Sequence, residues 1–380
     1  MVAGPHILLL TTRTGGGHMN LAHALKQMLG EAYDVDIVDP YPAIFRQYYH
    51  LLGQRFLLLW QIQYALTDNV FVSMLVHRVL TPFVEKHIAT LIEKSKPQLI
   101  LSTHPLLSYE IARALERLRM RIPLVFQLTD LEQVHSTWFS EKRADVHLDI
   151  SFMAPTREIF QQALAHGIAP HRVHITGRPV RSQFLHLSPT VREEIFAQLD
   201  FDPAVFTIFL QGGAHGLANV DQTVKHILAA EVPVQILLAV GNNAKLAAAF
   251  AANRGMGRVR VLPFTEQIAP YMAAADMIAG KAGASSLTEA FILEKPFLIT
   301  SIIPGQETPS LRFLERHNLG WACLQPREQR QLITAIVNDP KMLAEKVVSI
   351  RAYKAWNLQA NQAITATIEK LLTPDASLSE

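Results

Sequence analysis

The stretch Ile7-Leu-Leu-Leu-Thr-Thr-Arg-Thr-Gly-Gly-Gly-His18 decides the fold of this chain. Its apolar residues are typical of a buried strand, and its three glycines allow a tight turn into a helical pattern at residues 21–28. The same pattern of a strand running into glycines returns at Phe209-Leu-Gln-Gly-Gly213. A strand, a glycine loop and a helix begin a βαβ unit, so the chain contains two such beginnings.

Short apolar runs alternate with helical stretches after both beginnings, which predicts two doubly wound parallel sheets. The chain of 380 residues is long enough for two domains. We therefore expect an α/β fold in which two domains, at residues 1–183 and 200–345, face a central cleft. A linker near residues 181–202 should join them, and a C-terminal helix at about 350–372 should pack back on the first domain. The predicted strands lie at residues 7–12, 35–38, 99–102, 124–128, 205–211, 235–240, 259–262, 277–279 and 297–300.

Composition excludes several classes of protein. A hydrophobic share of 49% and a charged share of 18% do not fit a disordered, collagen-like or coiled-coil chain. A net charge of +2 gives no reason to expect nucleic acid as a partner. Cys323 stands alone, which excludes an internal disulfide and favours a reducing, cytoplasmic location. The longest uncharged apolar stretch, residues 56–67, is shorter than the roughly 20 residues that span a bilayer, so we expect a soluble or peripheral protein.

The two glycine loops are candidate ligand sites. Backbone N–H groups at a helix N-terminus favour anions, so Gly16 and Gly17 in one loop and Gly212 and Gly213 in the other are candidates for binding phosphate groups. His18 would lie at the carboxyl edge of a parallel sheet, where a histidine can act as a general base. The alternative is that both loops are only tight turns and that His18 caps the helix.

Two loops of the second half carry carboxylates. Ser286 and Glu289 match the capping-box pattern S-x-x-E, but Glu289 could instead accept hydrogen bonds from a ribose. Gln306 and Glu307 follow a predicted strand and could bind sugar hydroxyls, or they could simply begin a solvated helix. In the first half, Asp130 ends a predicted strand, where it could orient or replace His18 as base, or cap the next segment.

These segments, taken in order, resemble the monogalactosyldiacylglycerol synthases and processive diacylglycerol glucosyltransferases, inverting enzymes of GT-B fold that are related more distantly to MurG. The resemblance covers nearly the whole chain. It rests on residues 14–18, Ser102-Thr-His-Pro105, Leu128-Thr-Asp130, His135-Ser-Thr-Trp138-Phe139, Gly177-Arg-Pro-Val-Arg181, Gly212-Gly213, Pro263-Phe264, Ala275-Asp276, Lys281-Ala-Gly283, Thr288-Glu289-Ala290 and Pro304-Gly-Gln306-Glu307.

The resemblance implies a role for each motif, with UDP-glucose or UDP-galactose as donor and diacylglycerol or a glycolipid as acceptor. His18 would be the base, and Trp138, beside His135, would lie near the lipid acceptor. The family needs no metal or other cofactor for donor binding, and the chain has no Asp-x-Asp signature. The implied donor residues are Phe264 beside the uracil, Glu289 on the ribose, Gly212, Gly213, Gly283 and Ser285 at the diphosphate, and Gln306 and Glu307 on the sugar.

Two positions depart from the family pattern. Met19 stands where the family commonly has a basic residue after the histidine. Ser310, preceded by Pro309, stands where the family has an asparagine, so the identity of the donor sugar stays open. The alternatives are a transferase with another lipid-linked acceptor, a UDP-sugar 2-epimerase, and a UDP-sugar sensor without catalysis.

Residues 44–83 are rich in aromatic and aliphatic side chains at helical spacing, with arginines among them. Such helices can lie in the interface of a bilayer, or they can pack on the sheet. With a lipid acceptor, we expect peripheral binding to the inner face of the membrane.

Overall fold

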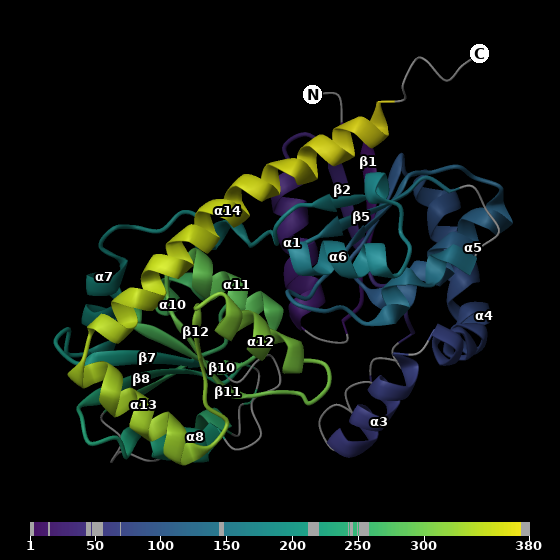
Figure 1. Ribbon diagram of the computed structural model, residues 1–380. Helices are drawn as coiled ribbons and strands as arrows, with labels where there is room; N and C mark the ends of the chain where they lie inside the picture. The colour runs from purple at the N-terminus through teal and green to yellow at the C-terminus, as the bar shows by residue number, and fades with distance from the viewer. Residues whose placement is uncertain are drawn as a thin grey trace. The chain divides into compact units, whose positions relative to one another are not determined.

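The computed structural model divides the chain into two compact units (Figure 1). The first contains residues 1–181, 304–309 and 356–380, and the second contains residues 182–303 and 310–355. The structure describes residues 4–13, 16–42, 47, 56–68, 70–143, 148–211, 220–241, 243, 246–248, 250 and 258–373.

The first unit contains a six-stranded parallel sheet in the order β2-β1-β3-β4-β5-β6. Successive residues of a strand face opposite sides, so Leu8 and Leu10 of β1 face one side of the sheet while Ile7 and Leu9 face the other. The strands are β1 (His6–Leu10), β2 (Asp34–Val38), β3 (Leu99–Ser102), β4 (Leu124–Gln127), β5 (Ile150–Ala154) and β6 (Val173–Ile175).

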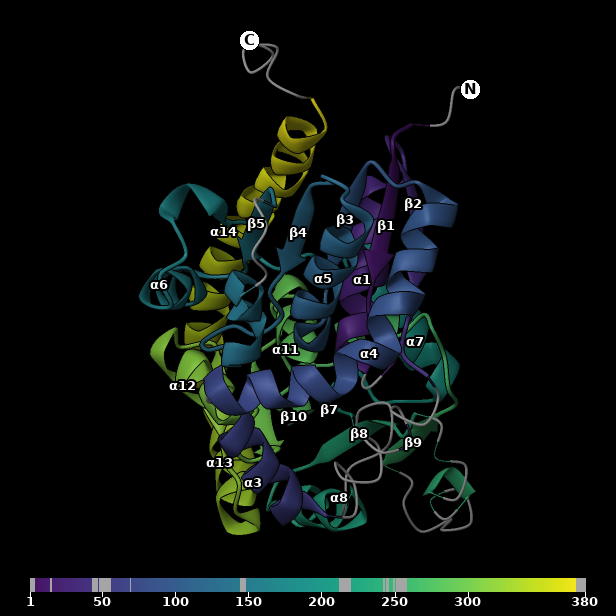
Figure 2. The ribbon, with the colours of Figure 1, turned by 90° about the vertical axis from the view of Figure 1, so that its right-hand side faces the viewer.

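Helices cover both faces of this sheet (Figure 2). On the side of Leu8, the core contains residues from α4 (Val70–Ser95), α5 (Ser108–Leu118) and α6 (Arg157–Ala165). On the side of Ile7, it contains residues from α1 (Gly16–Leu29) and the end of α14 (Lys341–Leu372). The short helix α3 (Leu57–Thr67) contacts α4.

The second unit contains another six-stranded parallel sheet, in the order β12-β11-β10-β7-β8-β9. Its strands are β7 (Phe206–Gln211), β8 (Val234–Ala239), β9 (Val259–Leu262), β10 (Met277–Lys281), β11 (Phe297–Ser301) and β12 (Gly320–Ala322). On one face, α8 (Val220–Leu228) and α13 (Pro326–Asn338) share a core with β7 and β8. The remaining helices are α7 (Val191–Leu199), α10 (Ala269–Ala274), α11 (Ala284–Ile292) and α12 (Thr308–Arg316).

The predicted fold class is confirmed, since both sheets are parallel and alternate with helices. All nine predicted strands are present, and their ends differ from the predicted ones by at most two residues. The sequence pattern missed β5, β6 and β12, of which the last two have only three residues each. The stretch predicted as a linker instead contains η4 (Ser182–Phe184) and α7, and it groups with the second unit from Ser182 onward.

The helix α14 contributes to both units. Its residues up to Ala355 group with the second unit, and those from Trp356 group with the first. Ile364 and Ile368 are fully buried against the first sheet beside α1. Among the described residues, no helix has both the length and the apolarity that crossing a bilayer requires.

Candidate active site

The carboxyl edge of the first sheet brings together the candidate acid–base residues. The chain order reverses between β1 and β3, because β2 lies on one side of β1 and β3 on the other. In open α/β sheets, ligands bind at such a reversal, beyond the carboxyl ends of the strands. His18 follows β1, His104 follows β3 and Asp130 follows β4, so all three reach this edge.

His18 is oriented by a backbone carbonyl of the neighbouring strand end. Its Nδ1 lies 2.6 Å from the carbonyl oxygen of Thr103. A carbonyl only accepts hydrogen bonds, so Nδ1 carries the proton and Nε2 keeps its lone pair. Thr103 is itself fixed, since its hydroxyl donates to the hydroxyl of Thr11 at 2.8 Å. His18 is therefore a neutral imidazole with a basic nitrogen and a fixed orientation, and it binds a strand end rather than capping α1.

A second imidazole packs against the first. The ring centroids of His18 and His104 are 4.5 Å apart, and Nδ1 of His104 accepts the backbone N–H of Leu106 at 3.3 Å. Burial lowers the pKa of His18 to about 4, although its hydrogen bond to Thr103 acts in the opposite direction and the Arg178 charge lowers it further. Burial and the neighbouring His18 lower the pKa of His104 well below its usual value. Both rings are therefore neutral at pH 7.

Asp130 carries the carboxylate of this edge. Burial raises its pKa to about 6, opposed by the Arg178 charge and by the Thr129 hydroxyl, which donates to Oδ2 at 3.2 Å. The next helical element, η2 (Ser136–Arg143), begins six residues later, so Asp130 does not cap a helix. Arg178 had no predicted role of its own, and its only signal in the sequence is the motif Gly177-Arg-Pro179.

The pH dependence of turnover tests whether Asp130 takes part in proton transfer. Between pH 5 and 7, Asp130 changes its charge, whereas His18 stays neutral. We expect kcat/KM to fall as the pH falls through about 6, because Asp130 then loses its negative charge. Asp130→Asn should remove this acid limb. The profile is measured between about pH 4.5 and 8, which extends roughly one to two units on either side of the pKa of Asp130. A wild-type profile that is level down to pH 5 would exclude Asp130.

His135 has a structural role in the first unit. Its Nε2 lies 3.2 Å from the carbonyl oxygen of Tyr64, and its Nδ1 lies 2.7 Å from the hydroxyl of Thr137. Burial lowers its pKa, so the ring is neutral. Nε2 thus binds the end of α3 and Nδ1 binds η2, so the ring links these two elements, and its contact with an acceptor stays a prediction.

Trp138 is a core residue. Its side chain is 1% exposed, and its ring lies edge-on to Phe126 with centroids 6.4 Å apart. A side chain enclosed in this way cannot contact a bound acceptor without unpacking the core. The prediction that Trp138 binds the acceptor is therefore not supported, and the aromatic signal in the sequence reflects packing.

The start of α11 is the candidate diphosphate site of the second unit. The strand order reverses between β7 and β10, and α11 follows β10 directly. Gly283 is the N-cap residue and Ser285 lies in the first turn, where backbone N–H groups favour an anion. Gly212 and Gly213, which follow β7, lie outside the described residues.

The capping box, which was one of the two alternatives for Ser286 and Glu289, is not present. The helix begins at Ala284 with Gly283 as its cap, so Ser286 is already inside the first turn. Glu289 lies one turn further on and is 6% exposed. The carboxylate therefore needs another explanation than capping.

The other donor candidates are spread over two loops. Phe264 follows β9 and is 62% exposed, so its ring is open to a ligand. Gln306 is half-buried and Glu307 is buried just before α12, in the short segment 304–309 that groups with the first unit. Ser310, the departure from the family pattern, is buried inside α12.

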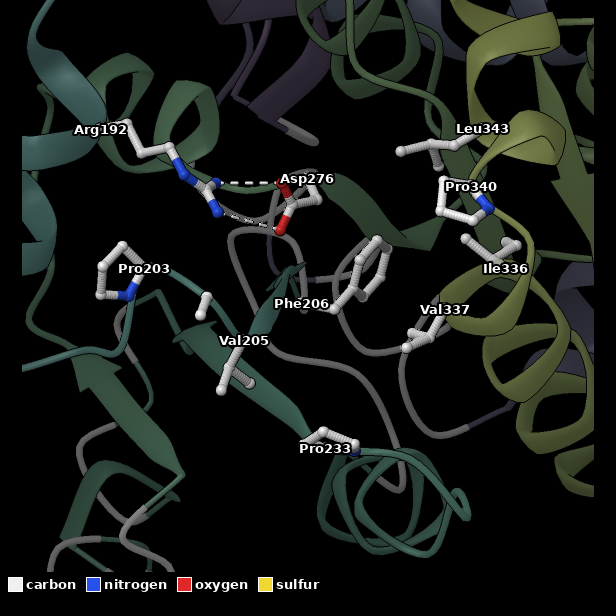
Figure 3. Close-up of a pocket in the computed structure, with 11 residues that line it drawn as sticks. Arg192, Pro203, Val205, Phe206, Pro233, Asp276, Ile336, Val337, Pro340 and Leu343 are labelled. Atoms are coloured by element: carbon white, nitrogen blue, oxygen red, sulfur yellow. Dashed lines mark hydrogen bonds and ion pairs between the residues drawn. The ribbon is translucent and has the colours of Figure 1, made fainter.

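A cavity of about 340 Å³ lies elsewhere in the second unit (Figure 3). The cavity lies at the amino ends of the strands, because Val205, Pro233 and Asp276 directly precede β7, β8 and β10. Arg192 and Asp276 form an ion pair there, with Nη1 of Arg192 3.1 Å from Oδ1 of Asp276. This edge is opposite to the one where the α11 site lies, so the cavity does not belong to the candidate site.

Comparisons with known proteins agree with this arrangement. Residues 18–180 match the family model of monogalactosyldiacylglycerol (MGDG) synthase, and residues 207–310 match the glycosyltransferase family 28 C-terminal domain. The probable monogalactosyldiacylglycerol synthase 2, chloroplastic, of Oryza sativa subsp. japonica is 28% identical over 99% of this chain and 83% of its own length. Among solved structures, MurG of Acinetobacter baumannii has a TM-score of 0.61 at 16% sequence identity. Anabaena HepE in complex with UDP-glucose has a TM-score of 0.60 at 15% identity. Each match covers 96% of this chain and 99% of the other chain.

Proposed function

We propose that this chain belongs to the monogalactosyldiacylglycerol synthase family, whose model residues 18–180 match, and that it is an inverting hexosyltransferase that moves a sugar from a UDP-sugar to a hydroxyl of diacylglycerol or of a glycolipid. The observation that carries the proposal is the neutral, oriented imidazole of His18 at the reversal point of the first sheet. Transfer to a hydroxyl needs a group that accepts its proton, and Nε2 of His18 is such a group.

The proposed reaction is a single displacement. The acceptor oxygen attacks the anomeric carbon, its proton moves to Nε2 of His18, and the bond from that carbon to the UDP oxygen breaks. One displacement inverts the anomeric centre. Negative charge then develops on the diphosphate, where the N–H groups at the start of α11 favour it. The proposal includes no metal ion or other cofactor.

The donor side of the proposal assigns the ribose of UDP to Glu289. Glu289→Ala should weaken UDP binding by roughly 10- to 100-fold, since hydrogen bonds to a charged group contribute about 1.5–3 kcal/mol. Titration calorimetry with UDP measures this effect. Glu294→Ala is the control, because Glu294 is a carboxylate beyond the other end of α11 that pairs with Arg351 and Lys354, so its loss should leave the affinity for UDP unchanged. Unchanged affinity in Glu289→Ala would remove the ribose contact from the proposal.

The membrane side of the proposal rests on α3. Its exposed side chains are apolar, with Leu58 exposed to 69%, Leu66 to 57%, Leu59 to 54% and Ile62 to 49%. The opposite side of the helix holds the buried Trp60, and no residue of α3 is charged. A stripe of this kind suits the interface of a bilayer. We propose that α3 binds the inner face of the membrane, where the acceptor lipid lies.

Negative charges introduced on the exposed apolar side of α3 should strongly weaken binding to lipid vesicles. In the double variant Leu59→Glu, Ile62→Glu, we expect the share of protein that sediments with anionic vesicles to fall by about tenfold or more, because each carboxylate opposes burial in the interface. UDP affinity should stay the same. Val348→Glu, on an equally exposed site of α14, serves as control. Unaltered sedimentation of the double variant would show that α3 does not bind the bilayer.

Release of UDP is the direct test of the proposed function. It is measured from UDP-glucose and UDP-galactose, each with and without dioleoylglycerol in mixed micelles, and with EDTA in a parallel series. We expect release that depends on the lipid, yields a glycolipid and persists in EDTA. The donor that reacts identifies the sugar, which Ser310 leaves open.

Each other outcome points to one of the alternatives. Release with a polyprenyl-linked sugar but not with dioleoylglycerol would indicate another acceptor. Conversion of the donor without any acceptor would indicate a 2-epimerase. Binding of UDP without turnover would indicate a sensor.

A further inference from the structure

The last turn of α3 is fastened to the start of η2 by polar contacts. Nε2 of His135 lies 3.2 Å from the carbonyl oxygen of Tyr64 and 3.3 Å from the hydroxyl of Thr67. The carboxylate of Asp68, the C-cap residue of α3, accepts the backbone N–H of Ser136 at 2.8 Å. The carboxyl end of α3 is therefore held in a defined place within the first unit.

The ring of Tyr64 contacts both this connection and a turn of the candidate donor site. The ring centroids of Tyr64 and His135 are 4.7 Å apart in an edge-on arrangement. A Cβ built on Gly305 would lie 3.5 Å from Cδ1 of Tyr64, which is van der Waals contact, so the ring packs beside the backbone of this glycine. Gly305 has a φ of +83°, and its N–H donates to the hydroxyl of Thr308 at 3.2 Å.

This turn presents the side chains that are proposed to bind the donor sugar. Gln306 and Glu307 follow Gly305 directly. The segment 304–309 groups with the first unit, as α3 does, so the contact between Tyr64 and Gly305 lies within one unit. A change in the position of Tyr64 therefore acts on the backbone from which Gln306 and Glu307 extend.

The helix that carries Tyr64 gains little stability from itself. It has 11 residues, fewer than the roughly 12–15 that an isolated helix needs in water, and its N-cap residue Phe56 makes no side-chain capping bond. Its exposed apolar side chains include Leu59 and Ile62. A lipid surface that covers them binds the helical form better than a frayed one, so it shifts α3 toward the helix.

We propose that Tyr64 is a positioning residue that couples the bilayer to the donor segment: a lipid surface stabilises α3, α3 holds the Tyr64 ring in place, and the ring orders residues 304–309. This coupling rests on the membrane side of the proposed function and deepens it. Ordering the turn fixes Gln306 and Glu307 for the donor sugar. The enzyme then binds its donor most tightly on the surface that contains the acceptor.

Hydrogen exchange followed by mass spectrometry tests this coupling on the full chain, with and without vesicles of phosphatidylcholine and phosphatidylglycerol. The amides of residues 305–308 report on the turn, and those of residues 57–68 report on α3. In the wild type, we expect the vesicles to slow exchange in both segments by about threefold or more. In Tyr64→Ala, the vesicles should still bind and should still slow exchange in α3, but should leave residues 305–308 unchanged.

Matched variants separate the ring contact from other effects. Tyr64→Phe should behave as the wild type, because a ring carbon makes the contact with Gly305. Gln61→Ala, a change at a half-buried polar residue three positions earlier in α3, should retain both vesicle effects. Thermal unfolding is measured for every variant. If Tyr64→Ala does not fold, Tyr64→Leu takes its place, because leucine also lacks the planar ring.

Turnover gives a second readout, which depends on the proposed function. With dioleoylglycerol in the vesicles, Tyr64→Ala should raise the KM for the reactive UDP-sugar by about three- to tenfold, while kcat and the Kd for UDP stay within about twofold of wild type. A general loss of structure would weaken the binding of UDP and of the UDP-sugar alike.

Three results would overturn the proposal. The first is exchange at residues 305–308 that vesicles slow equally in the wild type and in Tyr64→Ala. The second is exchange there that vesicles do not slow in the wild type, although the protein sediments with them. The third is no sedimentation at all, which also removes the membrane side of the proposed function. Because exchange needs no turnover, it decides the role of Tyr64 even if no lipid is glycosylated and the proposed function fails by itself.

Discussion

His18→Gln is expected to lower kcat by about 100-fold or more while the Kd for UDP stays unchanged. General-base assistance is worth roughly 10²–10⁴-fold, and glutamine keeps the size and a donor for the Thr103 carbonyl but has no basic nitrogen. The start of α11, where the diphosphate is proposed to bind, belongs to the other unit and is untouched by the change. Steady-state kinetics with the reactive donor and calorimetry with UDP measure the two quantities.

His23→Gln is the matched control for this prediction. His23 lies on the same helix α1, one and a half turns along, and its side chain is exposed. The control should retain wild-type turnover. Normal kcat in His18→Gln would show that another group accepts the proton, and the profile of Asp130→Asn would then identify whether it is Asp130.

Trp138→Ala is expected to lower the free energy of unfolding by about 3–5 kcal/mol, the range for removing a large aromatic side chain from a core. The indole is 1% exposed and packs in one cluster with Phe126 and Phe139. Urea unfolding followed by circular dichroism gives the change. At temperatures where the variant is folded, the KM for the acceptor should stay within about twofold of wild type.

Trp138→Phe separates packing from acceptor binding. It keeps an aromatic ring in the cluster and should cost less stability than alanine, because the cavity it leaves is smaller. A large rise in the KM for the lipid with little loss of stability in either variant would instead support the contact that the family resemblance implies.

The sequence predicted those elements whose signal is local. The strands β1, β7 and β10 are apolar runs that lead into glycines, and a short stretch of sequence is enough to recognise them. β6 and β12 have three residues each and carry too little periodicity to be recognised. The S-x-x-E pattern predicted a capping box because the sequence does not show that α11 begins at Ala284.

The sequence predicted which side chains lie at the candidate site, but it did not predict the contacts that hold them there. His18 and Asp130 could be placed at a sheet edge because each follows a strand. The orientation of His18 depends on Thr103, 85 residues away, and that of Arg178 on Asn357, 179 residues away. No local pattern encodes such pairs. These two contacts and the burial of Trp138 therefore emerge only from the folded chain.

The return of α14 to the first sheet has a consequence for biosynthesis. Ile364 and Ile368 cover apolar residues of β1 and α1 that leave the ribosome more than 300 residues earlier (from Ile7 and Leu9 to Ile364). During translation that face of the sheet lacks its cover, and exposed apolar surface on a nascent chain promotes aggregation. The first domain to be made is thus the last to be finished, so its maturation depends on prior synthesis of the entire second domain.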